Sequence, residues 1–383
     1  MHFATLLFKN LLRRKTRSLL TCCGVAIAVG TTVVLLGITD SFERATVHAF
    51  EGRGVDLVVI EEGVIDQLSS DLDEKMVQRV ARLPEVKDVA PGLLDLAAFP
   101  ALGSTVTALV QGWEVQGFLL QGLKITSGQG LTEPNQHAAI IGKGLADSLQ
   151  KQPGDSLEIE GETFEIVGIF ESFTPAENSG VVIPLPQMQR IKYRPERVTG
   201  FSVVVRQDGG DTAAVDRVRR QISKLVDEQG KSGRMVAQPV RDYVQASGHI
   251  RIAHAMAWMT SVIAIVVGAI GMLNTMIMSV VERVREISIL RAIGWKKSRV
   301  IRMILGESLI ISMVGATLGS LGAIVLSQGL ARWPAVQGMI DGSIGPPIVA
   351  MGFLMSTLLG LVGGVYPALR AARLLPAEGL RHE

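Results

Sequence analysis

The stretch "ERVREISILRAIGWKKSRV", residues 282–300, carries eight charged side chains in nineteen residues. It lies between two long apolar runs, from about Ala255 to Val281 and from Met303 to Ser327. Two further apolar runs extend from about Ser18 to Thr39 and from Pro346 to Ala368. A helix crosses a hydrocarbon core of ~30 Å with about 20 residues. The sequence therefore predicts four transmembrane helices, with the basic segment joining the second to the third.

The composition also favours a membrane protein. Of the 383 residues, 48% are hydrophobic and only 5% are aromatic, and the mean hydropathy is +0.33. Many of the 41 glycines fall inside the apolar runs, as is common in transmembrane helices. Buried helices of a soluble protein are the alternative, but apolar runs of this length with almost no charge are rare in soluble cores.

The first apolar run is predicted to be retained as a membrane anchor. A signal peptide also has a basic start, but its apolar part covers only about 7–15 residues and is followed by an A-x-A-like cleavage site. This run is longer, and no such site follows it. The two cysteines, Cys22 and Cys23, are neighbours within the run, so they indicate neither a disulfide framework nor a metal site.

Lysines and arginines indicate the orientation of the chain. Residues 1–17 contain five of them and no acidic residue, and residues 282–302 contain seven. By the positive-inside rule these segments and the C-terminal tail, with Arg370, Arg373 and Arg381, are cytoplasmic. Residues 40–250 hold 21 basic and 30 acidic residues, a net charge of −9, whereas the rest of the chain has a net charge of +11. Both termini are thus predicted inside and one large domain outside.

These observations divide the chain into nine segments. They are a cytoplasmic N-terminal segment (1–17), transmembrane helix 1 (18–39), an extracytoplasmic α+β domain (40–250), transmembrane helix 2 (251–281), a cytoplasmic coupling segment (282–302), transmembrane helix 3 (303–327), a short extracytoplasmic loop (328–345), transmembrane helix 4 (346–369) and a cytoplasmic tail (370–383).

Residues 40–250 have the alternation of strands and helices that is typical of a folded α+β domain. "VDLVVIEEG" (55–63) and "FSVVVR" (201–206) are rich in β-branched residues and predict strands. Residues 156–170 alternate around Glu160-Gly161 and predict a hairpin. Apolar residues at three- and four-residue steps predict helices over 72–83 and 215–225. Long gaps between these elements predict two packed subdomains rather than one sheet.

The sequence contains no spacing typical of an enzyme. The histidines of this region, His48, His137 and His249, and the near-membrane His254 just beyond it have no partner at metal-ligand spacing. "GKGLAD" (142–147) lacks the first glycine and the following Ser or Thr of a phosphate loop. We therefore expect a non-enzymatic chain without a cofactor or metal of its own. A membrane-bound hydrolase would require a nucleophile–base pair, which the sequence does not show.

Three stretches resemble the FtsX/MacB-type family of ABC transporter permeases. "ERVREISILRAIGWKKSRVIRMILGESLIISMVGATLGSLGA" (282–323) is similar to the family's segment between its second and third spans. "YPALRAARLLPAEGLRHE" (366–383) resembles the family's usual ending, and "HAAIIGKGLADSLQKQPGDSLEIEGETFEIVGIF" (137–170) resembles its extracytoplasmic core. The chain differs from MacB in showing no fused nucleotide-binding domain, so the ATPase is expected to be a separate polypeptide.

The resemblance implies the partners and the location. It implies two copies of a cytoplasmic ABC ATPase that bind ATP and Mg²⁺, and a homodimer or a heterodimer with a related permease in the bacterial inner membrane. It leaves room for a periplasmic adaptor and implies no nucleic acid. The residues that it assigns to ATPase coupling are Glu282, Arg283, Arg285, Glu286, Arg291, Ala292, Gly294 and Trp295.

Two interpretations of the basic segment remain open on the residues alone. Its apolar stripe of Val284, Ile287, Leu290 and Ile293, broken at Gly294, is compatible with a helix that lies on the membrane while Arg and Lys reach anionic lipid. The resemblance instead implies a coupling helix that docks into a groove of the ATPase. The two can coexist, with one face of the helix on the lipid and the other on the partner.

Polar and small residues inside the spans predict helix contacts. Asn274 predicts an interhelical hydrogen bond, and Glu307, about 6 Å inside the third span, predicts an ion pair with an arginine of the coupling segment or tail. Small-residue spacing that permits close helix approach occurs at Gly315 and Gly319 and at Gly360 and Gly364.

The family resemblance implies mechanotransmission, and the scarcity of polar residues in the spans is compatible with it. ATP-driven closure of the ATPase is expected to move the coupling segment, and the spans are expected to pass that motion to the outer domain for efflux or extraction of a hydrophobic or envelope-associated substrate. The alternative is a signalling scaffold of the division-associated type, whose outer domain regulates an extracytoplasmic hydrolase without transport.

Overall fold

The computed structural model describes residues 15–64, 66–101, 104–172, 175–206, 212–225, 235–332 and 342–374. The chain forms two compact units. The first, here called the helical unit, comprises Met1–Ser41 and Ile252–Glu383, and the second, here called the inserted domain, comprises Phe42–Arg251. Most of the predicted N-terminal segment (1–17), the end of the predicted tail (370–383) and part of the loop (328–345) lie outside the described residues.

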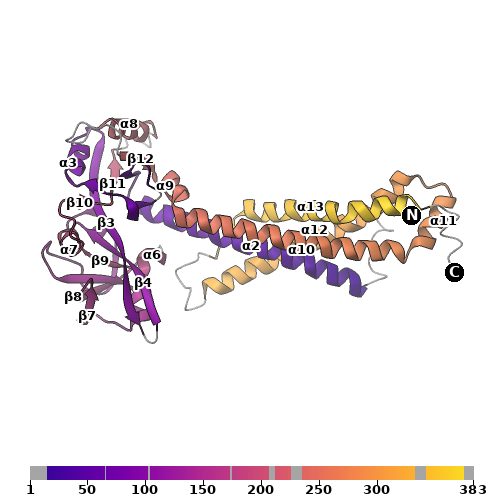
Figure 1. The fold of residues 1–383 in the computed structure, drawn as a ribbon, viewed down its shortest axis with the longest axis horizontal. Helices are drawn as coiled ribbons and strands as arrows, with labels where there is room; N and C mark the ends of the chain where they lie inside the picture. Colours follow the sequence, from indigo (N-terminus) through magenta and orange to yellow (C-terminus); the bar gives the residue numbers. More distant parts are fainter. Residues whose placement is uncertain are drawn as a thin grey trace. The chain divides into compact units, whose positions relative to one another are not determined.

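Among the described residues, four helices are long and apolar enough to cross a membrane, which confirms the prediction of four spans (Figure 1). They are α2 (Lys15–Gly52), α10 (Gly248–Val281), α12 (Lys297–Ala331) and α13 (Pro346–Ala372). All four are longer than the predicted spans, α2 and α12 by the most, because helical structure continues into polar flanks, and α12 begins inside the basic segment, at Lys297. Both α2 and α10 contribute residues to both units, so each connection between the units is helical throughout.

The four glycines predicted to allow close packing lie at helix contacts of the helical unit. A Cβ atom at Gly315 would lie 2.7 Å from Cγ1 of Val25 on α2, and one at Gly319 would overlap the carbonyl oxygen of Ala26 on the same helix. A Cβ atom at Gly360 of α13 would lie 2.5 Å from Oγ of Ser312 on α12, and one at Gly364 would overlap Oγ of Ser308. The Ser356 hydroxyl of α13 also donates to the Ser312 carbonyl at 2.6 Å. Side chains larger than hydrogen at these glycines would separate the helices.

In its described residues, the inserted domain has one sheet of ten strands, in the order β12-β1-β11-β3-β4-β9-β6-β8-β5 with β7 paired to β8, and a separate pair β10–β2. The strands are β1 (Leu57–Glu61), β2 (Leu72–Asp73), β3 (Val86–Ala101), β4 (Ser104–Trp113), β5 (Lys124–Gly128), β6 (Ala138–Gly142), β7 (Ser156–Ile159), β8 (Glu162–Glu171), β9 (Val181–Pro184), β10 (Arg197–Val198), β11 (Gly200–Val205) and β12 (Met235–Pro239). The prediction of two subdomains instead of one sheet is wrong, because β4 pairs with β9 in parallel and joins the two halves.

Local predictions in this domain were more accurate. The hairpin β7–β8 turns at Glu160 and Gly161, whose φ angles of 51° and 80° suit a two-residue hairpin turn. The helix predicted over 72–83 covers only Lys75–Ala81, because Leu72 belongs to β2 and pairs with Val198. The short helices of the domain, that one included, are η1 (Gln67–Ser69), α3 (Lys75–Ala81), α4 (Phe118–Gln121), α5 (Lys143–Leu149), α6 (Pro175–Asn178), α7 (Leu185–Ile191), α8 (Thr212–Ile222) and α9 (Val240–Ala246).

Both faces of the sheet are covered by apolar packing. Successive strand residues point to opposite faces, so Leu57 and Val59 belong to one buried cluster and Val58 and Ile60 to another. The second cluster includes Val47 of α2. The C-terminal turns of α2 therefore form part of the inserted domain's core.

Candidate functional site

The basic segment folds as a short helix, a tight turn and the start of the next span. Helix α11 (Val284–Ala292) follows α10 almost directly, with Arg283 as its N-cap residue. Gly294 then adopts a left-handed φ of 99°, which glycine tolerates better than other residues. The Trp295 amide donates to the Leu290 carbonyl at 3.1 Å and closes the turn. The segment is thus a helix–turn–helix connection whose second helix is the first turn of α12.

A buried ion pair fixes the start of α11 to α12. Nη1 of Arg283 lies 2.9 Å from Oε1 and 3.1 Å from Oε2 of Glu307, and the two side chains are only 9% and 6% exposed. The pairing that the sequence predicted for Glu307 is therefore present, with Arg283 as the arginine. Breaking a buried pair typically costs about 3–5 kcal/mol, because one charge is left without compensation. The contact makes α11 and α12 a connected element.

One face of α11 packs into the helical unit. Ile287 and Ser288 are buried, and Ile287 belongs to the same apolar cluster as Val300 and Ile304 of α12. The predicted apolar stripe has Ile287 buried in this packing and Ile293 74% exposed. Its periodicity extends one residue beyond Ala292, where the helix ends and the chain turns outward.

The opposite face of α11 is exposed and mixes apolar and charged side chains. Arg285, Ile289 and Ala292 recur at four- and three-residue steps, which places them on one side of α11, and Ile293 follows as the exposed C-cap residue. Ile289 is 42% exposed, and Glu286 and Ala292 are exposed beside it. We call Arg285, Glu286, Ile289, Ala292 and Ile293 the α11 face. An apolar centre with a charged rim is the usual anatomy of a protein interface.

Other predicted coupling residues shape the turn. Nη1 of Arg291 donates to the Trp295 carbonyl at 3.0 Å, and the guanidinium of Arg299 lies 5.2 Å from the centre of the Trp295 ring. Glu282 is exposed at the end of α10. Sequence reasoning missed Ile289, although its position four residues after Arg285 was a signal for a shared face.

Asn274 is exposed on α10 and not buried between helices of this chain. Together with Thr275 it lines an open, largely apolar cavity of about 550 Å³ between α2 and α10. Large apolar residues of α10 are exposed along the same helix, among them Met259, Val266 and Ile270. This helix therefore presents an apolar surface with one amide side chain.

Among the residues that the structure describes, no three His, Cys, Asp or Glu side chains are grouped as they would be in a metal site.

Comparison with known proteins gives matches over both units. The model of the MacB-like periplasmic core domain matches residues 18–225, and that of the FtsX-like permease C-terminal domain matches residues 258–376. The chain is 24% identical to the ABC transporter permease YknZ of Bacillus subtilis over 98% of this chain and 97% of that protein. It is 25% identical to the macrolide export ATP-binding/permease protein MacB of Brucella melitensis over 96% of this chain but only 58% of MacB. Among solved structures, the periplasmic region of MacB from Actinobacillus actinomycetemcomitans covers 51% of this chain, with 94% of its own length, at a TM-score of 0.41 and 15% identity.

Proposed function

Because the chain belongs to the FtsX/MacB-type family of ABC transporter permeases, we propose that it converts ATP hydrolysis by a separate ATPase into motion of the inserted domain. Two copies of the ATPase bind ATP and Mg²⁺ in the cytoplasm and dock on the α11 face. The motion exports or extracts a hydrophobic or envelope-associated substrate at the outer side of a bacterial inner membrane.

The observation that carries this proposal is the two-sided structure of α11. Its inner side is tied to α12 by Arg283 and Glu307, and its outer side presents Ile289, Ala292 and Ile293 to a partner. A partner that pushes on this face therefore pushes on a helix connected to a membrane span. An interfacial lipid anchor would need no such buried ion pair.

Two features support transmission through the membrane. Glycines and serines pack α12 closely against α2 and α13, which favours movement of the helices as a group over a wide polar conduit. The helices α2 and α10 also continue without interruption from the helical unit into the inserted domain. Uninterrupted helices are suited to passing axial displacement from one unit to the other.

The exposed surface of α10 supports a dimer. An amide side chain facing lipid is unfavourable, whereas an interhelical hydrogen bond contributes about 0.6–2 kcal/mol. Asn274 stands on this surface beside the open cavity. We propose that α10 of a second permease copy, identical or related, covers it. The distribution of basic residues supports cytoplasmic termini.

The export role draws on the relative MacB, whose name assigns it macrolide export. Transport and scaffolding differ in what stimulates ATP hydrolysis. An exporter reconstituted with its ATPase is stimulated by its substrate, whereas a scaffold is stimulated by an extracytoplasmic protein. A panel of hydrophobic compounds and envelope extracts, assayed on the reconstituted complex, separates the two functions.

The docking step is tested by a bulky substitution at Ala292. This residue is exposed on α11, so a tryptophan there leaves the fold intact but overpacks a groove that fits the α11 face, which typically costs about 1–3 kcal/mol. Gly294 is less suitable, because its left-handed φ of 99° would strain any larger residue. We expect Ala292→Trp to reduce co-purification of the ATPase by about tenfold or more.

The matched control is Val325→Trp, at a residue of α12 that is 70% exposed and lies near the other end of that helix. It should insert into the membrane and retain the ATPase as the unmodified chain does. Equal ATPase recovery with Ala292→Trp and with the control would show that the α11 face is not the docking site.

A further inference from the structure

The C-terminal turns of α2 are anchored in the inserted domain by aromatic and polar contacts. The ring of Phe50 packs edge-to-face on Tyr243 of α9, with centroids 6.1 Å apart. Glu43 of α2 accepts a hydrogen bond of 2.8 Å from the Gln245 side chain of α9. Since α9 is followed directly by α10, these contacts join the two segments that connect the inserted domain to the membrane spans.

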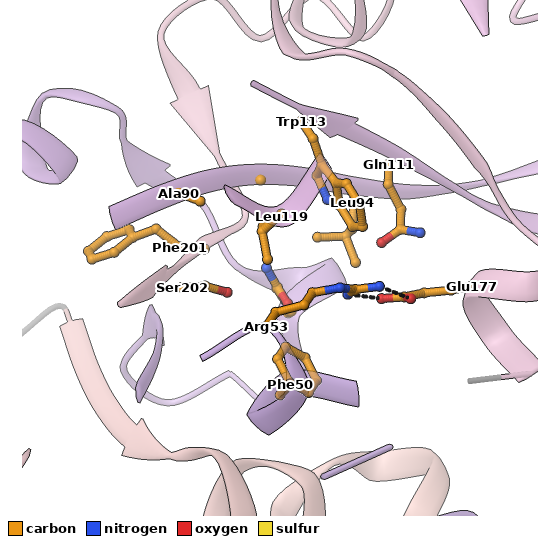
Figure 2. A pocket seen from close by; sticks show the side chains of 13 residues that line it. Phe50, Arg53, Ala90, Leu94, Gln111, Trp113, Leu119, Glu177, Phe201 and Ser202 are labelled. Atoms are coloured by element: carbon orange, nitrogen blue, oxygen red, sulfur yellow. Dashed lines mark hydrogen bonds and ion pairs between the residues drawn. The ribbon is translucent and has the colours of Figure 1, made fainter. Parts of the chain in front are cut away.

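Arg53, the first residue after α2, makes a second anchor that reaches a different part of the sheet. Its Nη1 and Nη2 atoms lie 2.7 Å and 2.6 Å from Oε1 and Oε2 of Glu177 in α6 (Figure 2). The side chains are only 8% and 13% exposed. The guanidinium lies 5.4 Å from the centre of the Trp113 ring, and Glu177 also accepts a 2.6 Å hydrogen bond from Ser172.

The Arg53–Glu177 pair lies where the two halves of the sheet meet. After Arg53 the chain enters β1, which belongs to the half of the sheet formed by β12, β1, β11, β3 and β4. Trp113 ends β4, and α6 leads into β9, the two strands whose parallel pairing joins the halves. Arg53 therefore links the end of α2 to the β4–β9 junction and to the half formed by β9, β6, β8 and β5. The strand that directly follows α2 in the chain, β1, belongs to the other half.

A small cavity lies beside the Arg53–Glu177 pair, so packed side chains do not enclose the pair completely. The space of about 50 Å³ is lined by Phe50, Gln111, Trp113 and Glu177, among others (Figure 2). It is far smaller than the roughly 300–1,000 Å³ of ligand pockets and has room for a few waters. The Gln111 side chain is 3% exposed, and within the described structure its Nε2 atom has no hydrogen-bond partner, which suits a water. An ion pair beside such a space can shift without rebuilding the packed side chains around it.

We propose that Arg53 is the positioning residue through which movement of α2 reaches the β4–β9 junction of the inserted domain. The proposal rests on the proposed mechanotransmission function and assigns its outer link to one ion pair. The domain offers a comparison: Arg190 also forms a two-pronged pair with Glu162, but it joins α7 to β8 and its side chain is 48% exposed. Of these two ion pairs, only Arg53–Glu177 involves the residue that directly follows α2.

The test compares hydrogen exchange in the purified full-length permease–ATPase complex, without nucleotide and with ATP plus vanadate. In the unmodified complex we expect ATP to change exchange in peptides of α2 (42–52) and in peptides of α6 and β9 (177–184). In Arg53→Ala and Glu177→Gln, the ATP-dependent change in exchange of the α2 peptides (42–52) should persist. The ATP-dependent change in the α6 and β9 peptides (177–184) should fall at least about fivefold, the lower end of typical coupling between sites.

Two further variants complete the test. Arg190→Ala, the matched control, should retain both changes, because its pair does not touch α2. Arg53→Lys keeps the charge but cannot bind both carboxylate oxygens at once, so it should give an intermediate change and serves if Arg53→Ala does not fold. An undiminished change at 177–184 in the Arg53 and Glu177 variants would overturn the assignment of Arg53 alone. An unmodified complex whose inserted domain does not respond to ATP at all would overturn the proposed function together with it.

Discussion

Arg283 and Glu307 form a buried ion pair, in which one guanidinium nitrogen contacts both carboxylate oxygens, and the pair joins the N-cap residue of α11 to α12. The pair lies beside α11, whose other side is the exposed α11 face. In the proposed function, this contact connects ATPase docking at the α11 face to the membrane spans.

Loss of either partner should destabilise the helical unit. Arg283→Ala or Glu307→Ala leaves a buried charge without its counterion, so we expect a loss of about 3–5 kcal/mol in the free energy of unfolding. Denaturant unfolding in detergent measures this change. Arg285→Ala removes an exposed arginine two residues away and should change stability by no more than about 0.5 kcal/mol. Similar effects at positions 283 and 285 would contradict the role of the pair.

Close packing of α12 against α2 depends on Gly319. A methyl group there would overlap the Ala26 carbonyl oxygen and lie 3.0 Å from the Gly30 amide nitrogen, and neither backbone atom can move aside easily. We expect Gly319→Ala to cost about 1–3 kcal/mol of stability and to reduce coupling of ATP hydrolysis to transport. Gly322→Ala on the same helix meets nothing within 4 Å and provides the control. Equal melting temperatures of the two variants would rule out this packing.

The inserted domain should lose stability in acid partly through Asp71. The hydrogen bond from Arg197, with Nε 2.9 Å from Oδ1, holds the pKa of this carboxyl below its usual range. A lowered folded-state pKa adds stability above the unfolded pKa of about 3.9, and that stability is lost as the pH falls through the folded value. Asp71→Asn should therefore melt at a lower temperature than the unmodified chain at pH 7, and the difference should shrink below about pH 4. A difference that is independent of pH would contradict this account.

The sequence predicted features that depend on neighbouring residues. The four spans followed from apolar length, and the β7–β8 hairpin followed from Glu160-Gly161 between alternating strands. Pairing between distant segments was not predictable, because no local pattern specifies that Val110 lies beside Val181. Arg53 and Glu177 likewise lie 124 residues apart and meet only through the sheet order. The exposure of Ile293 was not predictable either, because periodicity does not show where a helix ends, although Gly294 marked the turn.

The orientation of the chain is tested by thiol labelling at two described positions. In a background with Cys22 and Cys23 replaced by serine, a cysteine at Ser179 of the inserted domain should react with an impermeant reagent in cells without an outer-membrane barrier. A cysteine at Ser298, in the first turn of α12, should react only after the membrane is opened. The opposite pattern would invert the predicted topology.

The central claim is that the α11 face contacts the ATPase and moves with it, and photo-crosslinking from Ile293 tests it most directly. This side chain is 74% exposed, so a photoreactive amino acid there should be tolerated. Its yield of crosslinks to the ATPase should be high and should change when ATP plus vanadate is added, whereas the same amino acid at Val325, which is 70% exposed, should give none. Crosslinks from Ile293 to lipid alone, with or without nucleotide, would contradict the account.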